Sequence, residues 1–325
     1  HFIYLFLFLS FSCVEHIITV RVHPDGHYKM HLFTKGDSSD VFDSDFPHPK
    51  SEALWHSTQR KEYNDESEEF IWILESQGLL QKRTIFIKDS FDISSLRHPI
   101  IVSKKENWIS TIYTVEQVFE GREVYRKYPK FGDTVLNEEK SDSIQWLPEA
   151  LVYVCSQALN SISQDSLIQI DSALMERLNH HLKNYFIHVE TDRLLKELKQ
   201  ERLEMLKTAL NPFLQQLPGG FIQIMSTAMK PFEKEIRVTT ALKDDHFQFL
   251  LFMPGIISDT NADTIAGDTM KWEFGLADFL NDDKIIYSKS IVYSKPKIQK
   301  IMLFSALVMC ILLFIFWKKT KHETV

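Results

Sequence analysis

Four aspartates crowd one short segment and are the first residues that suggest chemistry: Asp37, Asp40, Asp43 and Asp45. Carboxylate oxygens on a flexible loop are the ligands that Ca²⁺ prefers. Their spacing, however, does not match an EF-hand loop, which needs a fixed Gly and a terminal bidentate Glu. The stretch around them, residues 36–50, is rich in turn residues and ends with two prolines. We interpret it as a solvated acidic loop without a metal.

The histidines that cluster in sequence form two groups. His180, His181 and His188 lie on a predicted helix, where the last two share a face because they are seven residues apart. Two imidazoles are too few for a catalytic metal, and no His-Glu-x-x-His motif supplies a base. The second group flanks a predicted hairpin turn and comprises His23, His27 and His31. We interpret both groups as polar surface residues.

Sequence motifs for a catalytic nucleophile are missing. There is no Gly-x-Ser-x-Gly, no Ser-x-x-Lys with its supporting elements, and no glycine loop for phosphate or dinucleotide binding. Cys155 lies among Val152, Val154 and Leu159 on a predicted helix, which indicates a packed thiol rather than a reactive one. We therefore predict no catalytic residues, no metal site and no cofactor. The cysteines Cys13, Cys155 and Cys310 predict no disulfide framework either.

An apolar run opens the chain. Phe2–Phe11 is apolar except for Ser10, and it is too short to span a bilayer but suits the hydrophobic region of a secretory signal. Cys13 then follows as in a bacterial lipoprotein signal, where this Cys becomes the lipid attachment site. Ser12 fits the small residue expected before it, whereas Phe11 departs from the pattern. Three interpretations stay open: lipidation at Cys13, which we favour, simple cleavage nearby, and an uncleaved N-terminal anchor.

A second apolar run, Ile301–Trp317, contains no charge, Gly or Pro. As a helix it spans roughly 26 Å, just under the ~30 Å hydrocarbon core of a bilayer. Lys300 and Lys318 can snorkel to the headgroups at either end, and Trp317 suits the interface. We predict a single transmembrane helix; the alternative is a buried core helix. Because lysines flank both ends, the N-terminal signal must set the orientation, with the bulk of the chain extracytoplasmic.

The first half of the chain has the alternation of β-strands. Val14–Thr34 predicts a hairpin, because apolar and polar residues alternate on both sides of a turn at Pro24-Asp25-Gly26. Ser51–Asn64 is ambiguous between helix and strand. Further strands are expected at Glu69–Glu75 and Lys82–Lys88, around a turn at Gln77-Gly78, and at Pro99–Ser103 and Trp108–Phe119.

Helical spacing replaces this alternation near Ser141. Pro148 suits the first turn of a helix that ends near Ser161, and two further helical stretches are Gln164–Val189 and Thr191–Leu210. Together with a short helix at Phe221–Met229 they form a helical insertion. Strands then return at Glu235–Leu242, His246–Met253, Thr269–Phe274 and Lys284–Tyr293. This order predicts an α+β fold: a mainly antiparallel β-sheet domain with a large α-helical insertion, plus one C-terminal transmembrane helix.

The same patterns divide the chain into segments. These are a signal peptide (1–12), the N-terminal β-rich half of the ectodomain (13–140), an α-helical insertion (141–230), the C-terminal β segment of the ectodomain (231–297), the transmembrane helix (298–317) and a cytoplasmic tail (318–325). If Cys13 is lipidated, we expect both ends of the ectodomain to be held at one membrane surface.

The C-terminal β segment carries a family resemblance. Leu250–Phe274 reads as an apolar strand, Pro254-Gly255, a polar stretch with Asn261, a Gly267 turn and then Trp272. With Cys13 and the Asp25-Gly26 turn, this pattern resembles the LppM-like, membrane-anchored extracytoplasmic lipoprotein domains of bacteria, whose function is uncharacterised. The resemblance implies an envelope-facing, membrane-tethered, β-rich domain with lipid binding as one option. It implies no catalytic residues.

Charge and composition narrow the function further. A net charge of −7 argues against a nucleic-acid-binding protein. The amphipathic insertion helices either pack internally, cover an apolar cavity for a lipid chain, or present a face to a partner. We expect a non-enzymatic, membrane-anchored cell-envelope protein that binds a lipid or an envelope protein partner at the membrane surface. The alternatives are an envelope-associated enzyme of hydrolase type and a purely structural interaction module.

Overall fold

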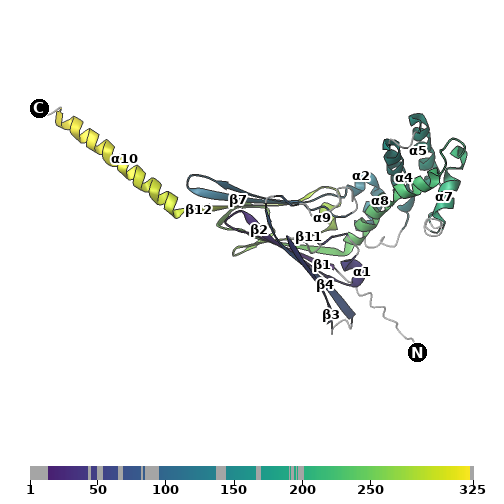
Figure 1. Cartoon of the computed structure of the whole chain (residues 1–325), viewed down its shortest axis with the longest axis horizontal. Helices are drawn as coiled ribbons and strands as arrows, with labels where there is room; N and C mark the ends of the chain where they lie inside the picture. The colour runs from purple at the N-terminus through teal and green to yellow at the C-terminus, as the bar shows by residue number, and fades with distance from the viewer. Residues whose placement is uncertain are drawn as a thin grey trace.

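The fold is α+β, as predicted, with two antiparallel-dominated sheets, a group of helices and a long apolar C-terminal helix (Figure 1). The computed structural model describes residues 14–42, 45–49, 54–64, 69–81, 83–84, 95–136, 144–165, 170–189, 191, 194, 196 and 201–322. Cys13, Asp43 and the predicted strand Lys82–Lys88, apart from two of its residues, lie outside these ranges.

The larger sheet has seven strands in the order β10-β11-β8-β1-β2-β4-β3. The predicted N-terminal hairpin forms its centre, and β1 also pairs in parallel with β8, so that Val14 lies opposite Asp245. The strands are β1 (Val14–Val22), β2 (His27–Gly36), β3 (Trp55–Asn64), β4 (Glu69–Gln81), β8 (Asp245–Phe252), β10 (Thr264–Ala266) and β11 (Thr269–Gly275). The beginning and the last third of the described chain therefore share one sheet.

The smaller sheet has five strands in the order β5-β6-β7-β12-β9, and all its pairs are antiparallel. Its strands are β5 (Arg83–Thr84), β6 (Ile100–Glu106), β7 (Ser110–Phe119), β9 (Ile256–Thr260) and β12 (Lys284–Tyr293). Phe119 from this sheet meets Phe274 of the larger sheet edge-to-face, with ring centroids 4.7 Å apart. The two sheets thus share one apolar core, in which each buried Phe contributes about 1.5–3 kcal/mol.

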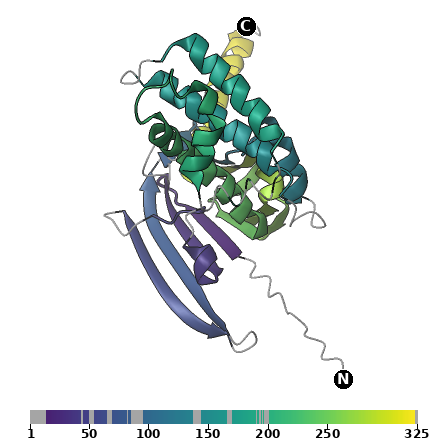
Figure 2. The ribbon, with the colours of Figure 1, turned by 90° about the vertical axis from the view of Figure 1, so that its right-hand side faces the viewer.

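Most helices gather at one end of the sheets (Figures 1 and 2). We call α4 (Leu147–Gln164), α5 (Ser172–Ile187), α7 (Arg202–Ala209) and α8 (Phe221–Ala241) the helical subdomain. Helix α4 packs against both α5 and α8, and α7 packs against α8. The shorter helices are α1 (Ser38–Val41), α2 (Val124–Lys127), α3 (Pro129–Leu136), η2 (Asn211–Phe213), η3 (Leu242–Asp244) and α9 (Leu276–Phe279). No sequence pattern predicted α2 and α3.

The predicted strand at Glu235–Leu242 is wrong, because α8 runs on to Ala241. In the sequence, Pro231 suggests the end of a helix, and the β-branched residues after it suggest a strand. In the structure, Pro231 lies inside α8. In the fold the hydroxyls of Thr239 and Thr240 donate to the carbonyl oxygens four residues earlier, at 2.8 and 2.9 Å. This bonding and the packing on α4 override the local β propensity.

The predicted turn at Gln77-Gly78 is also wrong, because β4 is one continuous strand from Glu69 to Gln81. Gly78 is needed there for close approach rather than for a turn. A Cβ atom at this position would lie 2.8 Å from the carbonyl oxygen of Leu54 and 2.9 Å from the ring of Trp55. Glycine in a strand marks such contacts as well as turns, and the sequence does not distinguish the two.

Helix α10 (Lys295–His322) extends away from the sheets at the end opposite the helical subdomain (Figure 1). Within the described residues it is the one helix long and apolar enough to span a membrane, and its side chains from Ile301 to Phe314 are all exposed. The alternative of a buried core helix is therefore wrong. Strand β12 leads directly into this helix, so the sheets and α10 are continuous in the chain.

The first described residue, Val14, lies at the other end of the sheets. It pairs with Asp245, which follows α8 and η3, whereas the far end of β8 reaches the turn at Gly255 beside Ile291 of β12. This geometry therefore does not favour the expectation that both ends of the ectodomain are held at one membrane surface. A lipid on Cys13 would tether the end that carries the helical subdomain.

Candidate functional site

The helical subdomain contains an apolar groove between α4 and α8. The buried face of α4 includes Leu147, Leu151 and Val154, which follow the spacing of about 3.6 residues expected for one side of a helix. Helix α8 contributes Ile236, Thr240 and Ala241 to the facing wall. The groove has a volume of about 790 Å³ and is lined by Trp146, Leu147, Ala150, Leu151, Val154, Arg202, Glu233, Ile236, Arg237, Thr240 and Ala241. We call it the α4–α8 groove.

Charged residues occur only along part of the α4–α8 groove. Arg202 forms an ion pair with Glu233, which neutralises both groups. Arg237 is exposed and has no hydrogen-bond or ion-pair partner among the described residues. The groove therefore combines an apolar wall with one uncompensated cation, which is the arrangement that an anionic amphiphile would match.

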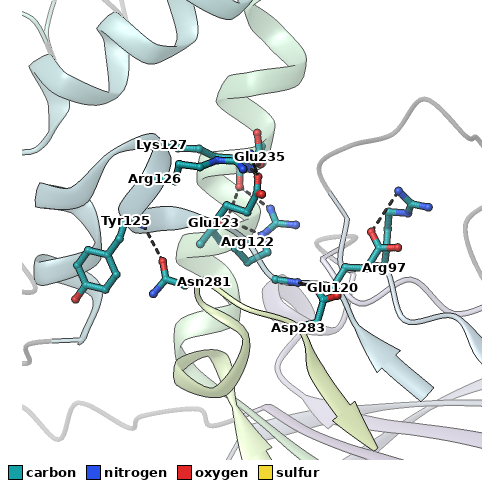
Figure 3. A network of polar contacts seen from close by, with 12 residues as sticks. Arg97, Glu120, Arg122, Glu123, Tyr125, Arg126, Lys127, Glu235, Asn281 and Asp283 are labelled. Carbon is teal, nitrogen blue, oxygen red and sulfur yellow. Dashed lines mark hydrogen bonds and ion pairs between the residues drawn. The ribbon is translucent and has the colours of Figure 1, made fainter. Parts of the chain in front are cut away.

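A second cavity, of about 840 Å³, lies where the sheets meet the helical subdomain and is lined mainly by charged side chains (Figure 3). Its polar contacts form what we call the junction network. Lys127 Nζ donates to Glu235 Oε1 at 2.6 Å, and Arg122 donates to Thr239 Oγ1 at 3.0 Å and to the carbonyl oxygen of Glu235 at 3.1 Å. Arg97 pairs with Glu120 at 3.2 Å.

Hydrogen bonds from backbone N–H groups in the junction network fix the loop between α9 and β12 against Gly121 and the helix α2. Gly121 N donates to Asp283 Oδ1 and Tyr125 N donates to Asn281 Oδ1, both at 2.8 Å. Glu123 adopts the left-handed conformation with φ 55°, which is strained for a side chain of this size. Since these groups bond to one another across elements, the junction network positions the helical subdomain rather than forming a reactive centre.

The tyrosines of this region cannot act as bases. Burial, followed by the nearby charge of Glu235, raises the pKa of Tyr128 far above its usual range. Burial raises the pKa of Tyr153 in the same way. Their rings meet edge-to-face with centroids 5.3 Å apart. Both phenols therefore stay protonated at neutral pH and serve packing.

Gly121 makes the tightest approach in the junction network and gives a testable prediction. A Cβ atom there would lie 2.3 Å from the carbonyl oxygen of Asn281 and 2.7 Å from the carbonyl carbon of Asp282. Gly121→Ala must therefore shift backbone, and we expect a loss of about 1–3 kcal/mol in the free energy of unfolding. Urea denaturation of the detergent-solubilised chain measures it.

The matched control is Gly219→Ala, because a Cβ atom at Gly219 meets nothing within 4 Å. This variant should be neutral or slightly stabilising. Equal stability of the two alanine variants would contradict the close packing at Gly121.

A row of polar side chains crosses the inner face of the larger sheet. His16 on β1 hydrogen-bonds Thr34 Oγ1 on β2 through Nδ1 at 2.8 Å and Asp245 Oδ2 on β8 through Nε2 at 3.2 Å. Thr34 Oγ1 also contacts His48 Nε2 at 2.7 Å, and His48 Nδ1 contacts Ser76 Oγ on β4 at 3.1 Å. We call these five side chains the polar row.

The polar row has the Asp–His–hydroxyl order of a hydrolase triad but not its accessibility. Thr34 is 2% exposed and His16 is 1% exposed. The ring of Phe46 covers His16 at 4.6 Å and stacks on His98 at 4.9 Å. Neither large cavity is lined by Thr34. A nucleophile must reach its substrate, so this hydroxyl does not form an active site.

Two histidines of this region are held neutral. Burial, and then the neighbouring His16, lowers the pKa of His98 from 6.5 to about 3. Burial, and then His16, His98 and His31, lowers the pKa of His48 to about 3. Gln117 Nε2 lies 3.1 Å from His98 Nδ1, where a neutral ring accepts a hydrogen bond.

The residues singled out from the sequence do not meet in one site. His181 contacts the carbonyl oxygen of Ala209 at 2.7 Å, and His188 contacts that of Asn184 at 2.7 Å. In the described part of the chain, no three His, Cys, Asp or Glu side chains are grouped so as to hold a metal ion. Burial raises the pKa of Cys155 to about 12, so this thiol is packed and not a thiolate.

The predicted solvated acidic loop needs correction at two places, because Ser38–Val41, which includes Asp40, forms the short helix α1, and because Asp45 is buried. Asp45 is 4% exposed, and its carboxylate accepts a hydrogen bond from Phe46 N at 2.5 Å. The carboxylate therefore orders the segment that places Phe46 over the polar row. Cys13, the predicted lipid attachment site, lies outside the described residues.

Neither the polar row nor the α4–α8 groove was predicted from the sequence. A signal for the row existed: His16 is in phase with Ile18 and Val20 on β1, and Thr34 is in phase with Leu32 on β2. A polar residue in phase with an apolar face predicts a buried, hydrogen-bonded group. No comparable signal exists for the groove, because it depends on how α4 and α8 pack.

Comparisons with known proteins add a single finding. No protein-family model matches the chain, and no curated protein matches it. Among solved structures, the NMR structure of the folded domain of LppM from Mycobacterium tuberculosis aligns over 88% of this chain and 94% of that chain, with 7% sequence identity and a TM-score of 0.31. This similarity is weak, and it assigns neither a family nor a function to this chain.

Proposed function

We propose that this protein is a non-enzymatic, membrane-anchored cell-envelope protein that binds an anionic lipid in the α4–α8 groove. The observation that carries the proposal is an apolar groove of about 790 Å³ with an uncompensated Arg237 at its edge. Ligand sites in proteins typically have volumes of about 300–1,000 Å³ and are mostly apolar with a few polar groups. The α4–α8 groove fits this description.

The apolar wall supports binding of an acyl chain. Ala150, Leu151 and Val154 line α4 without a polar side chain between them on this face, and Ile236 and Ala241 lie opposite. Burial of apolar surface contributes about 25 cal/mol per Å², so an extended hydrocarbon chain gains affinity along the whole groove.

The charge at the groove supports an anionic headgroup. Arg202 is already paired with Glu233, which leaves Arg237 for an incoming anion. A guanidinium binds a carboxylate or phosphate with two parallel hydrogen bonds. A neutral or cationic amphiphile would leave this charge without a partner.

Photolabelling tests the proposal. The full chain in detergent-free nanodiscs would receive a long-chain fatty acid that carries a diazirine, added from water as a monomer. We expect label on the peptides of α4 and α8 as well as on α10, which serves as an internal control for membrane exposure. Ala241→Trp should reduce the groove label about tenfold or more, because the indole occupies the space of the chain, while the α10 label stays unchanged.

Two matched controls sharpen this experiment. Ala173→Trp introduces the same side chain on an exposed position of α5 outside the groove and should leave the label unchanged. Arg237→Gln should weaken labelling by the fatty acid more than by its uncharged alcohol, whereas Lys230→Gln, exposed on α8 and outside the groove lining, should affect neither. Undiminished groove label in Ala241→Trp would refute the proposal.

The other function classes make different predictions for the same sample. A protein partner in the groove would prevent the fatty acid from labelling α4 and α8 and would protect these helices from proteolysis. A purely structural module would show neither effect. A hydrolase would release product from an ester of the probe, yet the polar row is closed to solvent and the junction network pairs its charges internally.

A further inference from the structure

The loop between β6 and β7 carries the most exposed large apolar side chain in the described part of the protein. Trp108 is 88% exposed, more than any apolar side chain of α10 between Ile301 and Phe314, and the adjacent Ile109 is 39% exposed. We call Asn107–Ile109 the hairpin tip. A fully exposed indole usually indicates a surface that a membrane or a partner molecule covers.

Hydrogen bonds fix the hairpin tip at the start of α10. Tyr293, at the end of β12, pairs with Ser110, and Ser294 N donates to the carbonyl oxygen of Ile109 at 2.8 Å. The next residue, Lys295, is the first of α10. The tip therefore lies beside the point where the chain leaves the sheets for the apolar helix (Figure 1).

Lysines surround this point. Lys105 on β6 and Lys295 and Lys300 on α10 are exposed and have no ion-pair partner among the described residues. Glu106, the acid nearest the tip, is 3.1 Å from Lys104 and 4.0 Å from Lys297, so its charge is compensated. The surface around the hairpin tip is thus apolar at its centre and cationic at its rim.

We propose that the hairpin tip inserts into the headgroup region of the same membrane that α10 spans, with the surrounding lysines on anionic lipids. Tryptophan and tyrosine favour this region because their rings are apolar with one polar group. Each lysine near an anionic surface adds attraction. Because α10 and the tip are joined through β12, two contacts fix the tilt of the sheets relative to this membrane.

This inference is independent of the α4–α8 groove and requires only that α10 spans a bilayer. The occupant is a lipid surface rather than a protein, because the tip is continuous with the one candidate span among the described residues and its rim is cationic. A protein partner at the same place would have to share the space with the headgroups.

Tryptophan fluorescence of the full chain in vesicles of phosphatidylcholine and phosphatidylglycerol tests the inference. The emission of Trp108 is obtained as the difference between the unmodified chain and Trp108→Phe. We expect this difference to be blue-shifted, protected from aqueous iodide, and reduced about twofold by lipids brominated near the headgroup. Since Trp108 is 88% exposed, its replacement should not affect folding.

Trp72→Phe is the matched control. Trp72 is half-buried on β4 at the end of the sheet away from α10, where it pairs with Gly36. The emission of Trp72, obtained as the difference between the unmodified chain and Trp72→Phe, should not be reduced by brominated lipids. Lys105→Gln should weaken the quenching of Trp108 in vesicles with phosphatidylglycerol but not in phosphatidylcholine alone. Free access of iodide to Trp108, or equal lipid quenching of Trp72, would overturn the inference.

Discussion

Acidification from pH 6.5 towards pH 3 is expected to destabilise the folded protein strongly. His48 and His98 have pKa values lowered from 6.5 to about 3 in the fold, mainly by burial. The unfolded chain therefore binds two protons in this window that the folded chain does not bind. Stability is fully present above pH 6.5 and falls by about 1.4 kcal/mol per pH unit for each histidine. At pH 5 the total loss approaches about 4 kcal/mol, a large part of a typical stability of about 5–15 kcal/mol.

The surroundings of His48 and His98 explain why an opposite charge does not stabilise their protonated forms. The titratable groups near them are His16 on β1, His31 on β2 and Asp245 on β8. The carboxylate of Asp245 is engaged with His16 Nε2, and His98 is packed between the aromatic rings of Phe46 and Phe119 with the uncharged amide of Gln117 beside it. His98 is 1% exposed, so a substitution at His98 is the direct test of this effect.

Urea denaturation of the detergent-solubilised chain at several pH values measures the effect. His98→Phe keeps the ring stack and should reduce the slope of stability against pH by about 1.4 kcal/mol per unit below pH 6.5. His246→Gln, on an exposed position of β8, is the control: it removes a histidine that lies outside the apolar core and should leave the slope unchanged. An unchanged slope in His98→Phe would show that His98 is not the group that takes up the proton.

The second large effect is expected for Lys127→Met in the junction network. The side chains of Lys127 and Glu235 are 15% and 6% exposed, and their charged atoms are 2.6 Å apart. Removing the ammonium group leaves a buried carboxylate without its closest partner, which costs about 3–5 kcal/mol. The methionine preserves the packing of the aliphatic stem, so the loss reports the charge.

A double variant distinguishes the loss of the Lys127–Glu235 ion pair from a general loss of packing. Lys127→Met combined with Glu235→Leu removes both charges and should regain most of the lost stability, because a buried apolar pair avoids the desolvation of two ions. Lys207→Met is the control: its partner Glu204 is 3.5 Å away and both side chains are more than half exposed, so the change should be below about 1 kcal/mol. If the double variant is no more stable than Lys127→Met, the ion pair is not the source of the loss.

Local patterns of the sequence were sufficient for several elements. The alternation around Pro24-Asp25-Gly26 predicted the central hairpin, and the predicted bounds of Lys284–Tyr293 agree with β12. The uncharged run Ile301–Trp317 predicted the long helix α10. These predictions depend on neighbours along the chain, where a period of 2 or 3.6 residues directly reports which side chains share a face.

Tertiary packing decided the structure where local propensity was misleading. Residues 235–241 have β-branched side chains and follow a proline, yet they form a helix because α4 covers their apolar side. Gly78 resembles a turn residue but allows β3 and β4 to approach. In both cases the deciding contact comes from another element, so the local sequence does not contain it.

The amino-acid sequence alone determined the fold class, the hairpin at the centre of the larger sheet and a C-terminal helix apolar enough for a membrane, because each of these follows from periodicity or composition over a short range. Only the tertiary structure decided what lies together. It joins Asp245 to His16 across 229 positions of the chain, forms the α4–α8 groove between two helices, and puts Trp108 beside the first turn of α10. These arrangements require the parallel pairing of β1 with β8 and the packing of α4 on α8, which are long-range contacts that no local pattern encodes.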